Sequence, residues 1–369
     1  MNMTLGRRVL LATAAPAMAL FVALLVSSAV LIASGSNPLE AFSEMVKNGV
    51  KLEVIIDTLN RATPLFLSGI AAAIGFKMNL FNIGVEGQYQ LAAFAAAVVG
   101  ANVVLPGVLH VGLIILVAMV VGALWSGLAG VLKTERGVNE VIGTIMLNYV
   151  VTNGIIAALY THVIDKGNAN NAGTPANDES GWLPDLNGVV ELFTREIQKG
   201  RKLTGMLAIA IVVGIFYHLL VNRSRIGFDL RASGINPVAA RAGGVPPKRM
   251  VIMSMLIGGV IAGLVGLPEI VGNNHSYDQG FVKGLGFLGI GVALLGRNKP
   301  LGIALSALLF AFLDSSAGVL QFSGTASKEI VVIMQATILF AAVIAYEVVN
   351  RIRLREEVKS ASLTTGATA

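Results

Sequence analysis

Few residues of this chain have the type and spacing that chemistry requires. Its four histidines, His110, His162, His218 and His275, are scattered without the spacing of metal ligands, and there is no Cys. The dipeptide Gly-Lys of a phosphate-binding loop does not occur, and no Ser stands in a Gly-x-Ser-x-Gly setting. The sequence therefore predicts no catalytic residue, no metal site and no ATPase site of its own. If the protein uses ATP, a partner must supply that energy.

The remaining candidates are polar side chains inside apolar runs. They are Asn82, Glu86 and Gln88 in one run and Asn148 and Asn153 in another. Such groups are costly in lipid and often functional, so they could hydrogen-bond a polar solute along a pathway. They could also be structural: Glu86 could tie down a broken helix, and the amides could join packed helices. Both interpretations stay open at this point.

Long apolar runs must position these side chains. From Gly87 to Leu132, 46 residues pass without Asp, Glu, Lys or Arg, and the whole chain is 55% apolar and 13% charged. A membrane helix needs about 20 apolar residues, and helices satisfy their own backbone groups in lipid. These features predict an all-α integral membrane protein with about ten transmembrane helices. The expected spans are residues 9–34, 62–78, 79–100, 108–132, 140–163, 203–221, 250–272, 284–296, 300–318 and 329–349.

The basic residues orient these spans. With the N-terminus inside, 17 of the 27 Lys and Arg residues fall on the cytoplasmic side, as the inside-positive rule requires. The sequence thus predicts both termini inside and one transmembrane domain over 1–350. It has an outer loop at 165–202, an inner loop at 222–249 and a cytoplasmic tail at 351–369. The net charge of +6 reflects this orientation and does not indicate nucleic-acid binding.

Three expected spans depart from a plain apolar helix. Residues 284–296 are short and rich in Gly, 79–100 carry the polar side chains, and 62–78 are short. Such segments in corresponding places predict two loosely related halves with broken helices. The outer stretch GNANNAGTPANDESG is polar and rich in turn residues, so we expect it to be mobile. Residues 38–60 are expected to lie along the outer interface, and Gly259 with Gly263 to serve helix packing.

The inner loop is the best candidate contact for an energy-supplying partner. Asn236 can cap a helix that starts at Pro237, and Gly243 with Gly244 can stop it. The result would be a short helix whose small residues let another surface approach. The coupling residues predicted here are Gly234, Asn236, Pro237, Ala239, Ala240, Arg241, Gly243 and Gly244. The alternative is a basic loop that merely fixes topology.

Four motifs resemble one family of membrane proteins. Residues 81–88 (FNIGVEGQ), 234–244 (GINPVAARAGG) and 284–296 (GLGFLGIGVALLG), followed by Pro300-x-Gly302, resemble the permease subunits of bacterial ABC importers. Residues 139–148 (NEVIGTIMLN) resemble the larger permease of nucleoside importers. One departure is Ala242, which stands where an aromatic residue is expected.

The resemblance implies the rest of a transport complex. The expected partners are cytoplasmic ATP-binding subunits that carry ATP and Mg²⁺, a second permease, an extracytoplasmic substrate-binding lipoprotein and the lipid bilayer of a bacterial inner membrane. The chain itself would hold no cofactor. Nucleoside is the leading solute and simple sugar the second. A different class, an ion-coupled secondary transporter, could use Glu86, Glu269 and Asp314. A membrane-embedded enzyme is a distant third.

Overall fold

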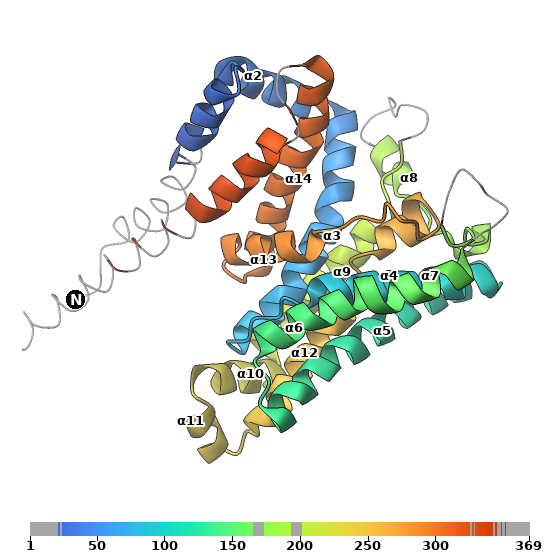
Figure 1. Ribbon diagram of the computed structural model, residues 1–369, viewed down its shortest axis with the longest axis vertical. Helices are drawn as coiled ribbons and strands as arrows, with labels where there is room; N and C mark the ends of the chain where they lie inside the picture. The colour runs from blue at the N-terminus through green and yellow to red at the C-terminus, as the bar shows by residue number, and fades with distance from the viewer. Residues whose placement is uncertain are drawn as a thin grey trace, which may run out of the picture. The chain divides into compact units, whose positions relative to one another are not determined.

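A computed structural model describes residues 21–22, 24–164, 173–192, 201–324, 327, 329–341, 344, 348 and 351. Every regular element among these residues is a helix, and the backbone pairs as a β-bridge only between Gly173 and Asp278 (Figure 1). The chain divides into two compact units. One unit is Leu52–Phe312, and the other combines Met1–Lys51 with Leu313–Ala369.

The helices of the larger unit follow in chain order. They are α3 (Leu52–Lys77), α4 (Val85–Asn102), α5 (Gly107–Arg136), α6 (Glu140–Tyr149), the π-helix η1 (Val150–Ile156), α7 (Ala157–Val163), the 3₁₀-helix η2 (Glu179–Gly181), α8 (Asn187–Glu191), α9 (Met206–Arg223), α10 (Arg225–Ile235), α11 (Pro237–Ala242), α12 (Pro247–Gly263), the π-helix η3 (Pro268–Asn273) and α13 (Leu285–Leu295). α14 (Pro300–Ser323) starts in this unit and ends in the other.

Five helices of the described residues are long and apolar enough to cross a membrane. They are Gly107–Arg136, Glu140–Val163, Met206–Arg223, Pro247–Asn273 and Pro300–Gln321. Shorter apolar helices occupy Leu24–Ala33, Leu285–Leu295 and Glu329–Ala341. Each of these eight overlaps one of the spans expected from the sequence. The count of ten spans and the cytoplasmic position of both termini stay predictions.

Two expected spans have different bounds from those predicted. The helix expected at 62–78 is not short, because α3 starts at Leu52 and has 26 residues, with Pro64 in its interior. Charged residues in its first turns lower the hydropathy there, which hid the true start. The span expected at 79–100 starts late, because Asn79 has a positive φ of 57° and α4 begins only at Val85. Residues 78–84, here called the α3–α4 linker, are therefore not part of either helix.

α5 and α12 pack with their backbones nearly in contact. A Cβ on Gly259 would lie 2.4 Å from the carbonyl oxygen of Gly122, and one on Gly263 would lie 2.1 Å from that of Ala118. Only glycine allows this approach, which brings many backbone atoms within van der Waals distance. The prediction that Gly259 and Gly263 serve packing is confirmed.

Part of the outer loop is fixed, contrary to expectation. In residues 173–183, the backbone N–H groups of Thr174, Asn177 and Leu183 donate to the carbonyl oxygens of Tyr277, His275 and Val271, each at 2.8 Å. The Trp182 indole donates to the Asn177 carbonyl oxygen at 3.1 Å. The prediction of a mobile loop was wrong for this segment, because its partners lie about a hundred residues further along the chain. Residues 165–172 and 193–200 lie outside the described residues.

In the smaller unit, α2 (Pro38–Gly49) is amphipathic. Asn37 caps it by accepting from the Leu39 N–H at 3.1 Å, and the hydroxyl of Ser323 donates to the Glu44 carboxylate at 2.8 Å. Ala41 and Met45 are buried on one face, while Val46 is exposed. α2 covers only the first part of the segment 38–60, because residues 52–60 belong to α3. The place of this segment along the outer interface stays a prediction.

Candidate functional site

The starts of α4 and α13 meet at Glu86. A Cβ on Gly286 would lie 2.4 Å from the backbone nitrogen of Glu86 and 2.7 Å from its Cα. Gly284 has a φ of +88°, a conformation that side chains other than glycine rarely adopt. The two glycines thus let the first turn of α13 sit directly on the first turn of α4.

The Glu86 carboxylate is held by donors from both helix starts. Oε1 accepts from Gly284 N–H at 2.7 Å and from the Gln90 amide at 2.6 Å, and Oε2 accepts from Gly286 N–H at 2.8 Å. The Tyr89 hydroxyl lies 2.9 Å from Oε1 and 2.9 Å from the Val282 carbonyl oxygen, and its proton can serve one of them at a time. Glu86 is only 6% exposed. A carboxylate at two helix N-termini satisfies free N–H groups and faces the positive ends of both dipoles.

The three predicted amides Asn82, Gln88 and Asn148 lie around the same helix start. The Gln88 amide donates to Asn82 Oδ1 at 3.0 Å, and the Gly84 N–H donates to the same oxygen at 3.1 Å. Asn148 reaches in from α6: its Oδ1 accepts from Gly87 N–H at 2.9 Å, and its Nδ2 donates to the Ile83 carbonyl oxygen at 3.0 Å. We call Glu86 and these three amides the α4 junction. All four side chains are buried and bonded to protein groups.

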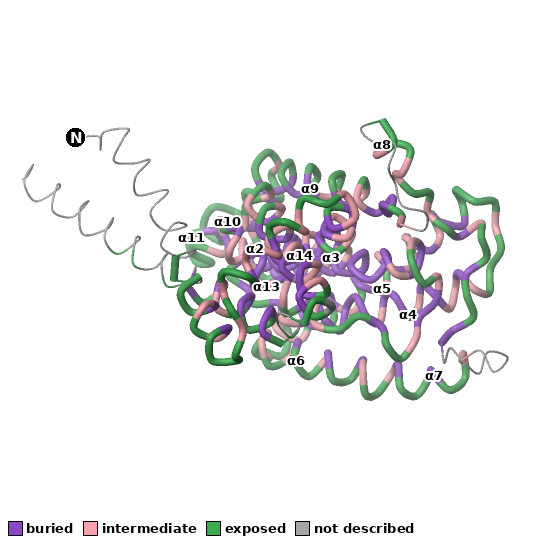
Figure 2. The backbone as a smooth tube through the Cα atoms, turned by 90° about the horizontal axis from the view of Figure 1, so that it is seen from above, coloured by how far each residue is buried: buried purple, intermediate pink, exposed green. Residues whose placement is uncertain are grey.

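Asn153 stands apart from the α4 junction. It lies in η1, within the span Glu140–Val163, and its side chain is exposed. Its amide nitrogen donates to the hydroxyl of Thr152 at 3.0 Å. Figure 2 shows the exposed surface that continues along α6 and α7. The structure thus joins four of the five polar candidates and leaves the fifth on an open face.

Two structural residues of the 139–148 stretch were not predicted. Asn139 caps α6 by accepting from the N–H groups of Val141 and Ile142 at 2.9 and 3.3 Å. Glu140 pairs with Lys133 at 2.5 Å across the α5–α6 turn. The signal for the cap was present, since Asn followed by an acidic residue favours a helix start.

The inner loop forms the short helix that its sequence predicts. Asn236 Oδ1 accepts from the N–H groups of Val238 and Ala239, each at 3.0 Å, and α11 starts at Pro237. Gly243 is its C-cap, and Gly244 has a φ of +83°. The preceding helix α10 was not predicted, although Ser224 caps it by accepting from Gly227 N–H at 3.0 Å.

The exposed face of α11 differs from the expected one. Ala240 is only 6% exposed and packs within its own chain, so it does not offer a surface to a partner. Ile235 is 85% exposed, Val238 is 79% exposed, and Ala239 and Arg241 are also exposed. A partner would therefore meet Val238 and Ala239 rather than Ala240, because the helical turn carries Ala240 to the opposite side.

The inner loop contacts the α3–α4 linker. A Cβ on Gly234 would lie 2.8 Å from both the Lys77 carbonyl oxygen and the Met78 carbonyl carbon. An apolar cluster extends this contact and consists of Met78, Leu80, Leu230, Met250, Val251 and Met255. Leu230 comes from α10 and the last three from α12. A movement of α10 would therefore act directly on the linker that leads to the α4 junction.

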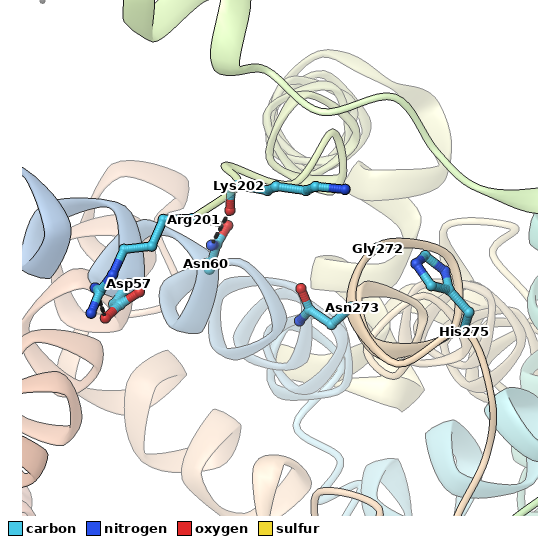
Figure 3. A pocket seen from close by; sticks show the side chains of 7 residues that line it. All are labelled: Asp57, Asn60, Arg201, Lys202, Gly272, Asn273 and His275. Carbon is cyan, nitrogen blue, oxygen red and sulfur yellow. Dashed lines mark hydrogen bonds and ion pairs between the residues drawn. The ribbon is translucent and has the colours of Figure 1, made fainter. Parts of the chain in front are cut away.

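A polar pocket of about 370 Å³ lies beside the first turns of α3 (Figure 3). Its lining residues are Asp57, Asn60, Arg201, Lys202, Gly272, Asn273 and His275. Arg201 pairs with Asp57, and Asn60 joins α3 to Lys202 and Thr204 by hydrogen bonds of 2.8 and 3.0 Å. The His275 ring stacks on Trp182 at a centroid distance of 4.0 Å. Burial and the nearby charge of Lys202 lower the pKa of His275, which favours the neutral ring.

Among the described residues, no group of three or more His, Asp or Glu side chains is placed to hold a metal ion. Glu86 lies in the α4 junction, Asp57 and Glu140 pair with basic residues, and Asp178 caps η2. The arrangement of the α4 junction suits the fixing of helix ends rather than bond-breaking chemistry.

Comparisons with known proteins give one consistent family. A family model described as "Branched-chain amino acid transport system / permease component" matches residues 54–343. The guanosine ABC transporter permease NupP of Bacillus subtilis is 33% identical, over 89% of this chain and 92% of that protein. The glucose ABC transporter permease TsgB13 of Haloferax volcanii is 31% identical, over 89% and 86%. The nucleoside ABC transporter permease NupB of Lactococcus lactis is 30% identical, over 89% and 90%.

Proposed function

This chain belongs to the family of branched-chain amino acid transport system permease components, and we propose that it forms half of the pathway of a nucleoside importer. It is a multi-pass protein of the inner membrane and a permease of the ABC class. The assignment of a nucleoside as the solute rests on the similarity to a guanosine permease over nine-tenths of both chains. A second relative at 30% identity is also named for nucleosides. The glucose relative at 31% identity supports a simple sugar as the second candidate.

The five polar candidates have two roles in this proposal. The α4 junction does not contact the solute, because its carboxylate and amides already bond to backbone and side-chain groups. It affects transport only by fixing the positions of the helix starts. Asn153 contacts the solute, with Thr152 beside it, because its amide is exposed within a span and Thr152 satisfies only one of its two N–H donors. A π-helical turn such as η1 often occurs at a functional site. Asn153 thus supplies hydrogen bonds suited to a ribose or a base.

The inner loop couples this pathway to ATP. In our proposal, Val238 and Ala239 of α11 lie against a cytoplasmic ATP-binding subunit, which holds ATP and Mg²⁺. Because Gly234 touches the carbonyl of Lys77, a push on α11 passes through α10 to the α3–α4 linker. The permease itself carries out no hydrolysis. Its other partners are a second, related permease that completes the pathway and a lipoprotein receptor that delivers solute to the outer face.

Reconstituted transport tests this function. The complex is assembled in liposomes from this chain, a second permease, the ATP-binding subunit and the receptor, and uptake of labelled guanosine and of labelled glucose is compared. We expect ATP-dependent guanosine uptake that unlabelled nucleosides suppress and glucose does not. A complex whose ATP-binding subunit cannot hydrolyse ATP is the control. Uptake by this chain alone under an ion gradient, or ATP hydrolysis by the pure chain, would refute the proposal.

A further inference from the structure

Three cations from separate segments converge at one end of the larger unit. Lys77 is the last residue of α3, Arg231 lies in α10, and Lys299 directly precedes α14. The positive charges of Arg231 and Lys299 both act on the Lys77 ammonium group. Figure 1 shows α10 beside the end of α3, where Gly234 contacts the Lys77 carbonyl oxygen. We call these three residues the cation cluster.

The turn that carries Lys299 is also fixed. The Tyr217 hydroxyl of α9 donates to the Asn298 carbonyl oxygen at 2.8 Å, and α9 leads into α10. A Cβ on Gly296 would lie 2.4 Å from the backbone nitrogen of Ile303, which closes the turn tightly. The backbone of the turn that carries Lys299 is thus fixed by packing.

The cation cluster has no anion of its own among the described residues. Ion pairs elsewhere in the described part of the chain join Lys133 to Glu140, Arg201 to Glu53 and Asp57, Arg225 to Asp229, and Lys248 to Glu135. None of them involves the cluster. Nη1 of Arg231 is buried and has no hydrogen-bond partner. Like charges repel, so an external anion would stabilise the three cations.

The surface next to the cluster is apolar. Leu301 is 81% exposed and Leu305 is 68% exposed, and they lie one turn apart on the same face of α14. α14 is one of the apolar helices long enough to cross a membrane. Lys77 ends α3 and Lys299 directly precedes α14. Where helices cross a membrane, their ends lie at the depth of the lipid headgroups. A ligand of this surface therefore has a negative head and an apolar body.

We propose that the cation cluster binds the phosphate of an anionic phospholipid in the cytoplasmic leaflet, with an acyl chain along Leu301 and Leu305. The leaflet follows from the orientation of the proposed function, whereas the lipid class follows from the residues themselves. Clusters of Lys and Arg at the cytoplasmic ends of membrane helices attract anionic lipids. A carboxylate of the ATP-binding subunit fits the surface less well, because the exposed leucines beside the cluster match an acyl chain.

Lipid binding can be measured on the assembled transporter. The complex is placed in nanodiscs of phosphatidylcholine with a minor fraction of spin-labelled phosphatidylglycerol, and the immobilised fraction of label is recorded. Arg231→Gln and Lys299→Gln should each weaken the preference for phosphatidylglycerol about fivefold. Arg225→Gln is the matched control: it removes one charge from the same helix, but its side chain is 94% exposed and faces Asp229. We expect it to leave the preference unchanged. Lys299 is exposed, so its substitution tests the site without disturbing the core.

Three results would overturn the proposal. An equal loss in Arg225→Gln would show a diffuse surface charge effect. Displacement of the labelled lipid by inorganic phosphate would show a site for free anions. Loss of the ATP-binding subunit from Arg231→Gln and Lys299→Gln, with lipid preference intact, would assign the cluster to that subunit. The spin label reports lipid binding whether or not the complex transports a solute. Failure of the nucleoside proposal would therefore appear only in the uptake of guanosine.

Discussion

Substitution of Glu86 by Gln separates a structural role from a role in solute binding. The variant keeps the shape of the side chain, removes its charge and replaces one acceptor oxygen by a donor amide. In the structure both oxygens accept: Oε1 from Gly284 N–H and Gln90, and Oε2 from Gly286 N–H. The new amide must therefore face a backbone N–H group, and either Gly284 or Gly286 loses its acceptor.

The cost can be estimated from these contacts. A buried donor left without an acceptor costs about 1–3 kcal/mol, and a bond to a charged group is about 1 kcal/mol stronger than a neutral one. The loss of charge at two helix N-termini adds about 0.5 kcal/mol for each. Since these effects overlap, we expect a loss of about 3 kcal/mol in the free energy of unfolding. For a unit of this size that lowers the thermal midpoint by about 6 °C.

The assay compares the thermal midpoint in detergent with the uptake ratio of guanosine to glucose. Glu269→Gln is the matched control, because Glu269 Oε1 accepts from the Asn273 amide at 3.2 Å within its own π-helix. We expect Glu86→Gln to lower the midpoint relative to this control and to leave the uptake ratio unchanged. An unchanged midpoint together with an altered ratio would show that Glu86 contacts the solute, and the structural reasoning would be wrong.

Three further predictions follow from the same contacts. Ala239→Trp should uncouple ATP hydrolysis from uptake in the reconstituted complex and leave the thermal midpoint unchanged. Ala240→Trp should instead destabilise the permease by about 1–3 kcal/mol, because Ala240 is buried. Equal effects of the two variants would show that α11 does not face the ATPase. Asn153→Leu should raise the KM of guanosine uptake about fivefold, the worth of one hydrogen bond, and normal uptake would remove Asn153 from the pathway. Gly259→Ala should lower the yield of folded protein in detergent, because its Cβ would lie 2.4 Å from Gly122 O. Gly112→Ala, with open space around it, should leave the yield unchanged. Equal yields from the two variants would contradict the close packing of α5 and α12.

Features with a local cause could be predicted from the sequence. The start and end of α11 depend on Asn236, Pro237 and two glycines within a few residues, and the prediction is confirmed. The long apolar runs likewise predicted the helices that can cross a membrane. The start of α3 was not predicted, because acidic and basic residues in its first turns give this stretch the polar composition of a loop.

Features that join distant residues could not be predicted. Glu86 and Gly286 are 200 residues apart, and no local pattern reports their contact. The same holds for Thr174, whose partner Tyr277 fixes a segment that its polar composition marked as mobile. The sequence left two interpretations of Glu86 open: a structural group that fixes a helix, or a group that contacts the solute. Only the four bonds around its carboxylate favour the structural interpretation, and they depend on the meeting of two helix starts.

If α11 meets the ATP-binding subunit as we propose, the α3–α4 linker connects that contact to the α4 junction. One end of the linker touches Gly234, beside the helix that we propose as the ATPase contact, and the other end holds Asn82 of the α4 junction. Met78 and Leu80 pack in the apolar cluster with Leu230, so the linker lies directly against α10. Through Glu86, any shift of the α4 start is passed to α13, because the carboxylate bonds to both. A push from the ATPase would thus reach two helix starts through packed atoms, without a long flexible connection.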